Sequence, residues 1–180
     1  MKGSSRVLLL DRDGVLNHDR PDYIQTVAQL RLISGVGEAM RRLREAGVAT
    51  LVVTNQACVG KGLVTPATLE AIHARLAAEI AEAGGEITQF YLCAHRNEDR
   101  CACRKPAPGL ILRAQQEWGF DPSQTWMVGD AERDIQAAEA AGCRAALVRT
   151  GKGEITVLRR PDVPAFADLP AFVENFLQNG

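Results

Sequence analysis

The stretch that decides the fold is RVLLLDRDGVLN, at residues 6–17. Its aliphatic run from Val7 to Leu10 predicts a buried strand, and Asp11 and Asp13 stand where that strand ends. Gly14 follows and allows a sharp backbone turn. Two carboxylates so close repel each other unless a cation lies between them. A turn with two capping aspartates would also explain this stretch, so the rest of the chain has to decide.

Length, composition and charge limit the classes to which the protein can belong. A chain of 180 residues with 46% hydrophobic content predicts one domain over residues 1–180 with a sizeable core. The net charge of -1 offers no electrostatic reason to bind nucleic acid or an anionic membrane. No apolar run approaches the roughly 20 residues that span a bilayer. The first apolar run is too short and starts too late for a signal peptide.

These features predict a cytoplasmic protein, whose five cysteines are therefore expected to stay out of disulfides. No coiled-coil pattern or exposed apolar stripe favours assembly, so we expect a monomer that binds a small molecule.

Strand and helix patterns alternate along the chain. Apolar runs predict strands at 6–11, 48–55, 87–93, 125–130 and 144–150. Helical spacing predicts helices at 35–47, 65–83, 108–119, 133–142 and 168–178, with Thr65 as the N-cap of the second. This alternation predicts an α/β fold with a doubly wound, Rossmann-like parallel sheet.

Ligands of such sheets bind where the strands end, at the carboxyl edge of the sheet. The polar residues of interest all fall at that edge: Asp11, Thr54 and Asn55, Asp130, and Arg104 and Lys105 in the loop after the third strand. Ordinary turn residues would be scattered over both edges. The common placement therefore favours a functional site.

Three aspartates at this edge suit a hard cation. Asp11, Asp13 and Asp130 offer oxygen ligands of the kind that Mg²⁺ prefers. Asp130 lies in VGDAERD and could equally cap the helix that follows. The magnesium hypothesis rests on the combination of Asp130 with the Asp11 and Asp13 pair.

Two further motifs suit a phosphoryl group. Thr54 and Asn55 in VVTNQ combine side-chain donors with free backbone N–H groups at a strand end. Lys105 in CRKPAPG precedes a helix N-terminus, where a cation is disfavoured unless an anion is also present. Taken singly, the first motif reads as a turn and the second as a surface lysine.

A dense cluster of metal-ligand residues lies in CAHRNEDRCAC, at 93–103. Cys93, His95, Cys101 and Cys103 form the ligand set of a closed tetrahedral zinc site. Four protein ligands leave no open coordination position, so the zinc would be structural and would tie down the loop that carries Arg104 and Lys105. Reduced surface thiols are the alternative.

Four pieces in order, DRDGVLN, VVTNQ, CRKP and GDAERD, resemble the four motifs of the haloacid dehalogenase superfamily of aspartyl-phosphate phosphatases. The resemblance covers residues 6 to about 150. It implies that Asp11 is the nucleophile and that Asp13 is the general acid and base. It also implies that Asp11, the Asp13 carbonyl and Asp130 hold Mg²⁺, with Asp134 orienting the metal's waters. Thr54 and Lys105 would hold the transferring phosphoryl group.

Many members of the superfamily carry a cap domain, and this chain has no room for one. We therefore expect an open site whose specificity comes from the loops at 17–23 and 56–62 and from the zinc loop. The candidate substrate-binding residues are Asn17, Asp19, Arg20, Asp22, Asn55, Gln56 and Arg104. Solvated loop polarity would explain the first loop nearly as well.

The zinc cluster narrows the resemblance to the branch of histidinol-phosphate and heptose-bisphosphate phosphatases. LDRDGVLN, VVTNQ…GKG and LVRTGKG most resemble the heptose-bisphosphate members. That resemblance implies removal of the 7-phosphate of D-glycero-D-manno-heptose 1,7-bisphosphate, in the synthesis of ADP-heptose and lipopolysaccharide core precursors. The five residues between His95 and Cys101 favour histidinol phosphate instead.

Two other classes of protein fit less well. A receiver domain would carry its accepting aspartate on a middle strand, and a zinc-stabilised interaction module would leave the four motifs unexplained.

Overall fold

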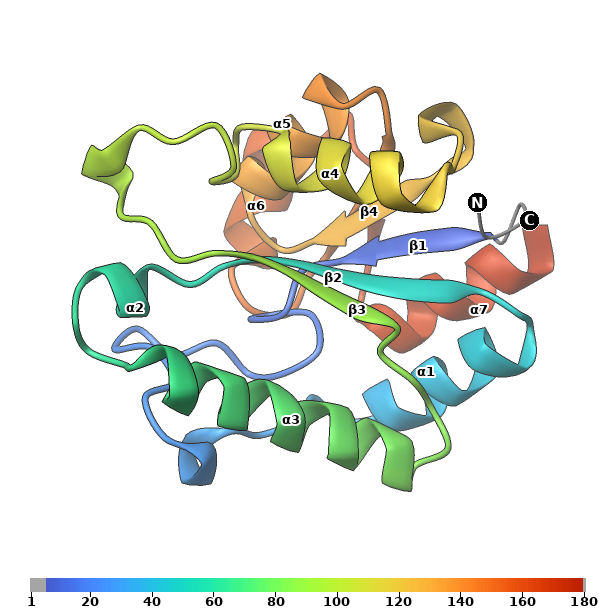
Figure 1. The fold of residues 1–180 in the computed structure, drawn as a ribbon. Helices are drawn as coiled ribbons and strands as arrows, with labels where there is room; N and C mark the ends of the chain where they lie inside the picture. Colours follow the sequence, from blue (N-terminus) through green and yellow to red (C-terminus); the bar gives the residue numbers. More distant parts are fainter. Residues whose placement is uncertain (1–5, 180) are drawn as a thin grey trace.

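A computed structural model of the protein describes residues 6–179, which form a parallel six-stranded sheet with helices on both faces (Figure 1). The strand order is β3-β2-β1-β4-β5-β6. This confirms the predicted doubly wound architecture. The strands are β1 (Val7–Leu10), β2 (Ala49–Asn55), β3 (Gln89–Cys93), β4 (Trp126–Gly129), β5 (Arg144–Val148) and β6 (Ala165–Phe166).

The helices form two layers. α4 (Gly109–Trp118) and α5 (Glu132–Ala140) cover one face of the sheet, and α1 (Val36–Glu45), α3 (Pro66–Glu82) and α7 (Leu169–Asn179) cover the other (Figure 1). α3 begins as expected: the Thr65 hydroxyl accepts a hydrogen bond from the backbone N–H of Thr68 at 3.1 Å, and Pro66 occupies the first turn.

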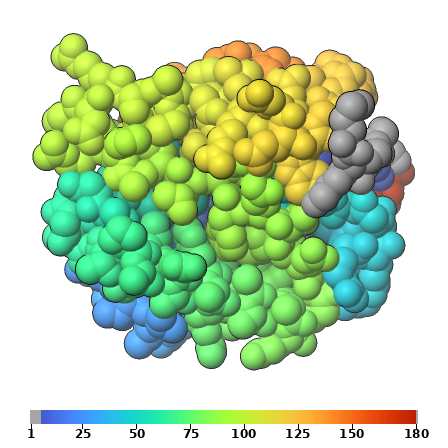
Figure 2. Space-filling model, in the orientation of Figure 1, coloured from blue at the N-terminus to red at the C-terminus, as the bar shows by residue number. Residues whose placement is uncertain are grey.

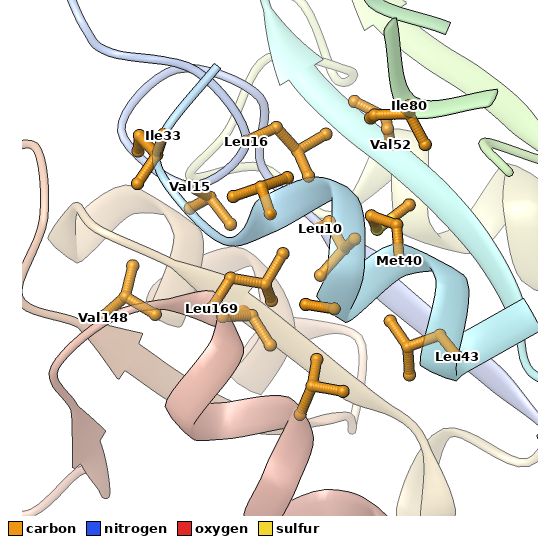
Figure 3. Packing of buried hydrophobic residues seen from close by; sticks show 14 of the residues in the cluster. Leu10, Val15, Leu16, Ile33, Met40, Leu43, Val52, Ile80, Val148 and Leu169 are labelled. Carbon is orange, nitrogen blue, oxygen red and sulfur yellow. The ribbon is translucent and has the colours of Figure 1, made fainter. Parts of the chain in front are cut away.

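Strand β1 supplies side chains to two separate cores, because successive residues of a strand point to opposite faces. Leu8 and Leu10 pack with α1, α3 and α7, whereas Val7 and Leu9 pack with α4 and α5. Figure 3 shows the first core, in which Leu10 lies among side chains of α1, such as Met40, and of β2. A strand buried on both faces has to be continuously apolar, which explains the run at the start of the sequence.

Besides short 3-10 helices, two α-helices and one strand were not predicted from the sequence. They are α2 (Ala57–Gly60), α6 (Gly153–Arg159) and β6. None is long enough to show a hydrophobic period, and α6 leaves Leu158 83% exposed. The predicted elements all form, each within about two residues of its expected ends.

The carboxyl edge of the sheet carries the loops that surround the site. The loop after β1 includes a short 3-10 helix (Val27–Gln29) and leads into α1, while α2 and α3 fill the connection from β2 to β3. The segment at 94–108 projects from this edge beyond α2, at the upper left of the molecule (Figure 2). Within residues 6–179, no helix has the length and apolar character needed to cross a membrane.

Candidate active site

Three carboxylates converge at the carboxyl edge of the sheet. Asp11 follows β1, Asp130 follows β4, and Asp134 lies in the first turn of α5. Their ligand-capable oxygens lie within 4.8 Å of one another, and all three side chains are buried. Burial and the Asp134 carboxylate raise the pKa of Asp11 to about 6. Burial and the carboxylates of Asp11 and Asp134 raise the pKa of Asp130 to about 8.

Glycine at position 14 is required because the β1 loop approaches Asp130 very closely. A Cβ on Gly14 would lie 2.1 Å from Asp130 Oδ2, and the backbone there has φ +83°. Gly151 lies beside Gly14 and approaches the same carboxylate, where a Cβ would lie 2.2 Å from Oδ2. The glycine that follows the opening pair of aspartates therefore makes room for the third.

Lys105 supplies the cation that lies among these carboxylates. Its Nζ lies 3.0 Å from Asp11 Oδ1 and 2.7 Å from Asp134 Oδ1, and it donates to the Val53 carbonyl at 2.6 Å. Burial alone would lower the pKa of Lys105, but the carboxylates of Asp11 and Asp134 outweigh it and raise the pKa. The ammonium therefore stays charged although its side chain is buried.

Asn55 positions this lysine. Its Nδ2 donates to the Lys105 carbonyl at 3.0 Å, and its Oδ1 accepts from the Lys105 N–H at 3.1 Å. The two bonds tie the end of β2 to the loop after β3. The buried Thr54 hydroxyl, one residue earlier, accepts a hydrogen bond from Gln56 Nε2 at 2.9 Å.

The Asp13 carboxylate points away from the acidic cluster. Arg12 donates to it from Nε at 3.1 Å and from Nη2 at 2.8 and 3.0 Å, Asn17 Nδ2 at 2.9 Å, and Gln56 Nε2 at 2.9 Å. Burial alone would raise the pKa of Asp13, but the Arg12 charge and the bonds from Asn17 and Gln56 outweigh it and lower the pKa. This surrounding stabilises the carboxylate form.

The role of Asn17 and Gln56 in binding substrate stays a prediction, and the structure adds a contact of each with Asp13. Both side chains are buried, and both amides are used on Asp13. Both residues lie in loops that were predicted from the sequence to recognise substrate, and in the structure their side-chain amides are directed at Asp13. Arg12, which links to Asp13, was missed in the sequence because an arginine between two aspartates reads as a solvated charge.

The acidic cluster fits a divalent cation. Asp130 Oδ2 accepts the backbone N–H of Lys152 at 2.8 Å, whereas buried Asp130 Oδ1 has no hydrogen-bond partner among the described residues. An ionised carboxylate oxygen left without a donor in the protein interior is costly unless a cation binds there. Oxygen ligands at this density are those of Mg²⁺.

The thiol and imidazole cluster forms as expected from the sequence. Cys93 Sγ lies 3.6 Å from Cys101 Sγ and 3.3 Å from Cys103 Sγ, and His95 Nδ1 lies 3.5 and 3.3 Å from Cys93 and Cys103. Ligands at about 2.3 Å from a tetrahedral zinc would lie about 3.8 Å apart, so the four groups have nearly the right spacing. The thiols are free, as are Cys58 and Cys143.

A cavity of about 550 Å³ opens at the carboxyl edge of the sheet. Its wall includes Asp13 and Asn55 from the core of the site. Four cations also line it: Arg20, Arg104, Arg133 and Lys152. The side chains of Arg20 and Arg133 each have a buried Nε with no hydrogen-bond partner among the described residues.

The loop residues predicted to bind substrate take up different positions. Asp19 lines the cavity and its carboxylate lies 3.4 Å from Lys152 Nζ. Arg104 also lines it and donates from Nε to Asn97 at 2.6 Å. Asp22 is not among the lining residues and pairs with Arg20 at 2.9 Å.

Arg133 and Lys152 were missed in the sequence. Arg133 lies in the motif GDAERD and Lys152 in LVRTGKG. A basic residue within each of these motifs was the sequence feature that could have identified them.

Comparisons with known proteins identify the family. A family model described as "HAD-hyrolase-like" matches residues 102–175. A D-glycero-beta-D-manno-heptose-1,7-bisphosphate 7-phosphatase of Pseudomonas aeruginosa is 42% identical over 178 residues, which cover 97% of this chain and 99% of that protein. The chain belongs to this family of phosphatases.

Solved structures of the same family agree with the fold. The crystal structure of D,D-heptose 1,7-bisphosphate phosphatase from B. bronchiseptica, complexed with magnesium and phosphate, has a TM-score of 0.94 at 35% identity, covering 97% of this chain and 99% of that one. The D,D-heptose 1,7-bisphosphate phosphatase of Burkholderia thailandensis has a TM-score of 0.77 at 32% identity, with the same coverage. The chain is thus a phosphoric monoester hydrolase of the haloacid dehalogenase type.

Proposed function

We propose that the protein removes the 7-phosphate of D-glycero-D-manno-heptose 1,7-bisphosphate through an aspartyl-phosphate on Asp11. Two observations carry the proposal: Asp11, Lys105 and Asp130 converge at the sheet edge, and a cavity lined by four cations and by Asp13 opens at the same edge. The family supplies the substrate class, and the cavity supplies the positive charge that a bisphosphate needs. The product, a heptose 1-phosphate, would serve the synthesis of ADP-heptose and lipopolysaccharide core precursors.

The first half of the reaction transfers the phosphoryl group to the protein. A carboxylate oxygen of Asp11 forms a bond to phosphorus, and the bond from phosphorus to the sugar oxygen breaks. Lys105 and Thr54 hold the phosphoryl oxygens, over which negative charge spreads as the group is transferred. Bound Mg²⁺, held by Asp11, the Asp13 carbonyl and Asp130, would neutralise part of that charge.

Asp13 handles the protons. In its protonated form it gives a proton to the departing sugar oxygen and is left as a carboxylate, which Arg12, Asn17 and Gln56 stabilise. It then takes a proton from the water that attacks the aspartyl-phosphate, and phosphate leaves with Asp11 restored. Asn17 and Gln56 therefore act on Asp13 rather than on the sugar, and Asp134 positions Lys105.

Recognition of the bisphosphate rests on the cavity wall. Arg20 and Arg133 present guanidinium groups with unpartnered Nε atoms, and Arg104 and Lys152 lie beside them. Guanidinium groups match phosphate oxygens in charge and in fork geometry. We assign these groups to the second phosphate, and Asp19 to the sugar hydroxyls. Histidinol phosphate has no second phosphate that could bind these side chains. This difference, together with the names of the relatives, favours heptose bisphosphate as the substrate.

The zinc loop places Arg104 at the cavity. Cys93, His95, Cys101 and Cys103 would hold a structural Zn²⁺, with no open position for chemistry. We further propose that the enzyme acts in the cytoplasm as a monomer, since its sequence shows no coiled-coil pattern that would favour assembly.

Phosphate release in the presence of Mg²⁺ tests the substrate. We expect kcat/KM for heptose 1,7-bisphosphate to exceed that for histidinol phosphate at least tenfold, or about 1.4 kcal/mol of transition-state discrimination. The opposite preference would show that the length of the zinc loop is the better guide to substrate.

A matched pair of variants tests the second-phosphate site. Arg104→Ala should raise KM for the bisphosphate about tenfold and leave KM for a heptose 7-monophosphate nearly unchanged. Arg100→Ala, on the same loop but not among the cavity residues, is the control and should leave both unchanged. An equal effect of Arg104→Ala on both substrates would remove Arg104 from the second-phosphate site.

A further inference from the structure

A buried chain of three side chains runs from helix α3 to the general acid and base. The guanidinium of Arg12, 1% exposed, donates from Nε and Nη2 to the Asp13 carboxylate. Its Nη1 lies 3.1 Å from Nε2 of His73, which is 61 positions away in the chain. His73 is itself 6% exposed and stacks on Phe90, with ring centroids 4.4 Å apart and an angle of 6° between the planes.

The chemistry of the pair fixes the state of the imidazole. A guanidinium has only donors, so Nε2 of His73 must accept the hydrogen bond and the ring proton must lie on Nδ1. Burial and the Arg12 charge lower the pKa of His73 to about 3, which agrees with a neutral ring. Removing the acceptor would leave one N–H of a buried guanidinium unsatisfied.

We propose that His73 is a positioning residue for the phosphatase reaction, which fixes the Arg12 guanidinium and through it the Asp13 carboxylate at the cavity wall. The proposal rests on the acid and base role proposed for Asp13. A residue needed only for packing against Phe90 would be served by any flat ring. The nitrogen directed at Arg12 is the feature that packing does not require.

Two substitutions separate positioning from packing. His73→Phe keeps the stacked ring and loses the acceptor, whereas His73→Gln loses the ring and keeps an acceptor near Nε2. We expect His73→Phe to lower kcat about tenfold with KM changed less than about twofold, because small displacements of a catalytic group are costly. We expect His73→Gln to keep most of the wild-type kcat, although it is the less stable of the two in thermal unfolding.

The reverse order of activities, with Phe better than Gln, would overturn the proposal and leave His73 with a packing role. A second measurement repeats His73→Phe in the Asp13→Asn background, where we expect no further loss of the residual kcat. A further tenfold loss there would show that His73 does not act through Asp13.

The same variants distinguish failure of the inference from failure of the mechanism. An Asp13→Asn variant with wild-type kcat would refute the acid and base role and the inference with it. An inactive Asp13→Asn beside a fully active His73→Phe would refute the inference alone.

Discussion

The two ligand clusters of this protein are built in different ways. The carboxylates of Asp11 and Asp130 stand at the ends of central strands and are at most 2% exposed, so the sheet itself sets their distances. Cys101 and Cys103 lie on the projecting segment at 94–108, half-buried and outside any strand (Figure 2). The first cluster lies at the ends of core strands, whereas the second joins two parts of a loop that has no strand or α-helix of its own.

The energetic consequence is opposite for the two clusters. Packing buries the carboxylates and holds them together, and burial, followed by their mutual repulsion, raises the pKa values of Asp11 and Asp130. In the loop, a bound metal would add cross-links between Cys93, His95, Cys101 and Cys103 to the contacts that the loop already makes. Loss of Mg²⁺ should therefore leave the sheet folded although the carboxylates repel one another more strongly. Loss of zinc should loosen the loop.

The largest expected effect comes from the acidic cluster. Asp11→Asn removes the nucleophile and should reduce phosphate release by roughly 10³-fold or more. The variant should remain folded, because it removes one of the repelling charges. Circular dichroism and thermal unfolding check the fold, and turnover near the wild-type rate would exclude Asp11 as the nucleophile.

The zinc loop should respond locally. The double variant Cys101→Ser and Cys103→Ser should lose bound zinc, measured by elemental analysis, and should exchange amide hydrogens faster over 94–108. We expect kcat/KM to fall about tenfold as Arg104 becomes misplaced, with Mg²⁺ affinity unchanged.

Cys143→Ser is the matched control for that variant, because Cys143 is a buried free thiol outside the cluster. It should keep its zinc. Absence of zinc from the wild-type protein would remove the structural-metal assignment.

The smallest effect is a dependence of stability on pH. Asp11 and Asp130 have folded-state pKa values of about 6 and 8, above the ordinary value of 3.8. The folded state then holds more protons than the unfolded state, so stability falls as pH rises from about 4 to 8. We expect the melting temperature of the Mg²⁺-free, zinc-loaded protein to decrease over this range.

Added Mg²⁺ should reverse this trend, because it competes with the protons that the carboxylates bind. The increase in melting temperature on adding Mg²⁺ should be larger at pH 8 than at pH 5.5. Asp130→Asn is the control and should show a smaller pH dependence. An equal Mg²⁺ effect at both pH values would place the cation away from this cluster.

Much of the architecture followed from local patterns. The uninterrupted apolar run of β1 predicted a strand covered on both faces, and the separate cores against α1 and α5 confirm it. Thr65 and Pro66 predicted the start of α3. Short elements such as α6 escaped because seven residues show no period.

For the site too, the positions of residues could be predicted from local patterns, but the directions of side chains could not. Residue types and their place after strands were enough to bring Asp11, Asp130 and Lys105 together, because parallel strands end at one edge. Side-chain direction was not accessible in this way. Asn17 and Gln56 lie in loops that were predicted to bind substrate, and the sequence could not show that their amides donate to Asp13.

The sequence by itself determined the fold class, the acidic cluster and the thiol ligand set, since each depends on residue types at short spacing or at strand ends. Tertiary structure alone decided what those groups touch. The bond from Arg12 to His73 joins residues 61 positions apart. Gly14 and Gly151, which lie far apart in the sequence, both approach the Asp130 carboxylate. Such contacts depend on how helices and loops pack across the sheet, which no local pattern of residues encodes.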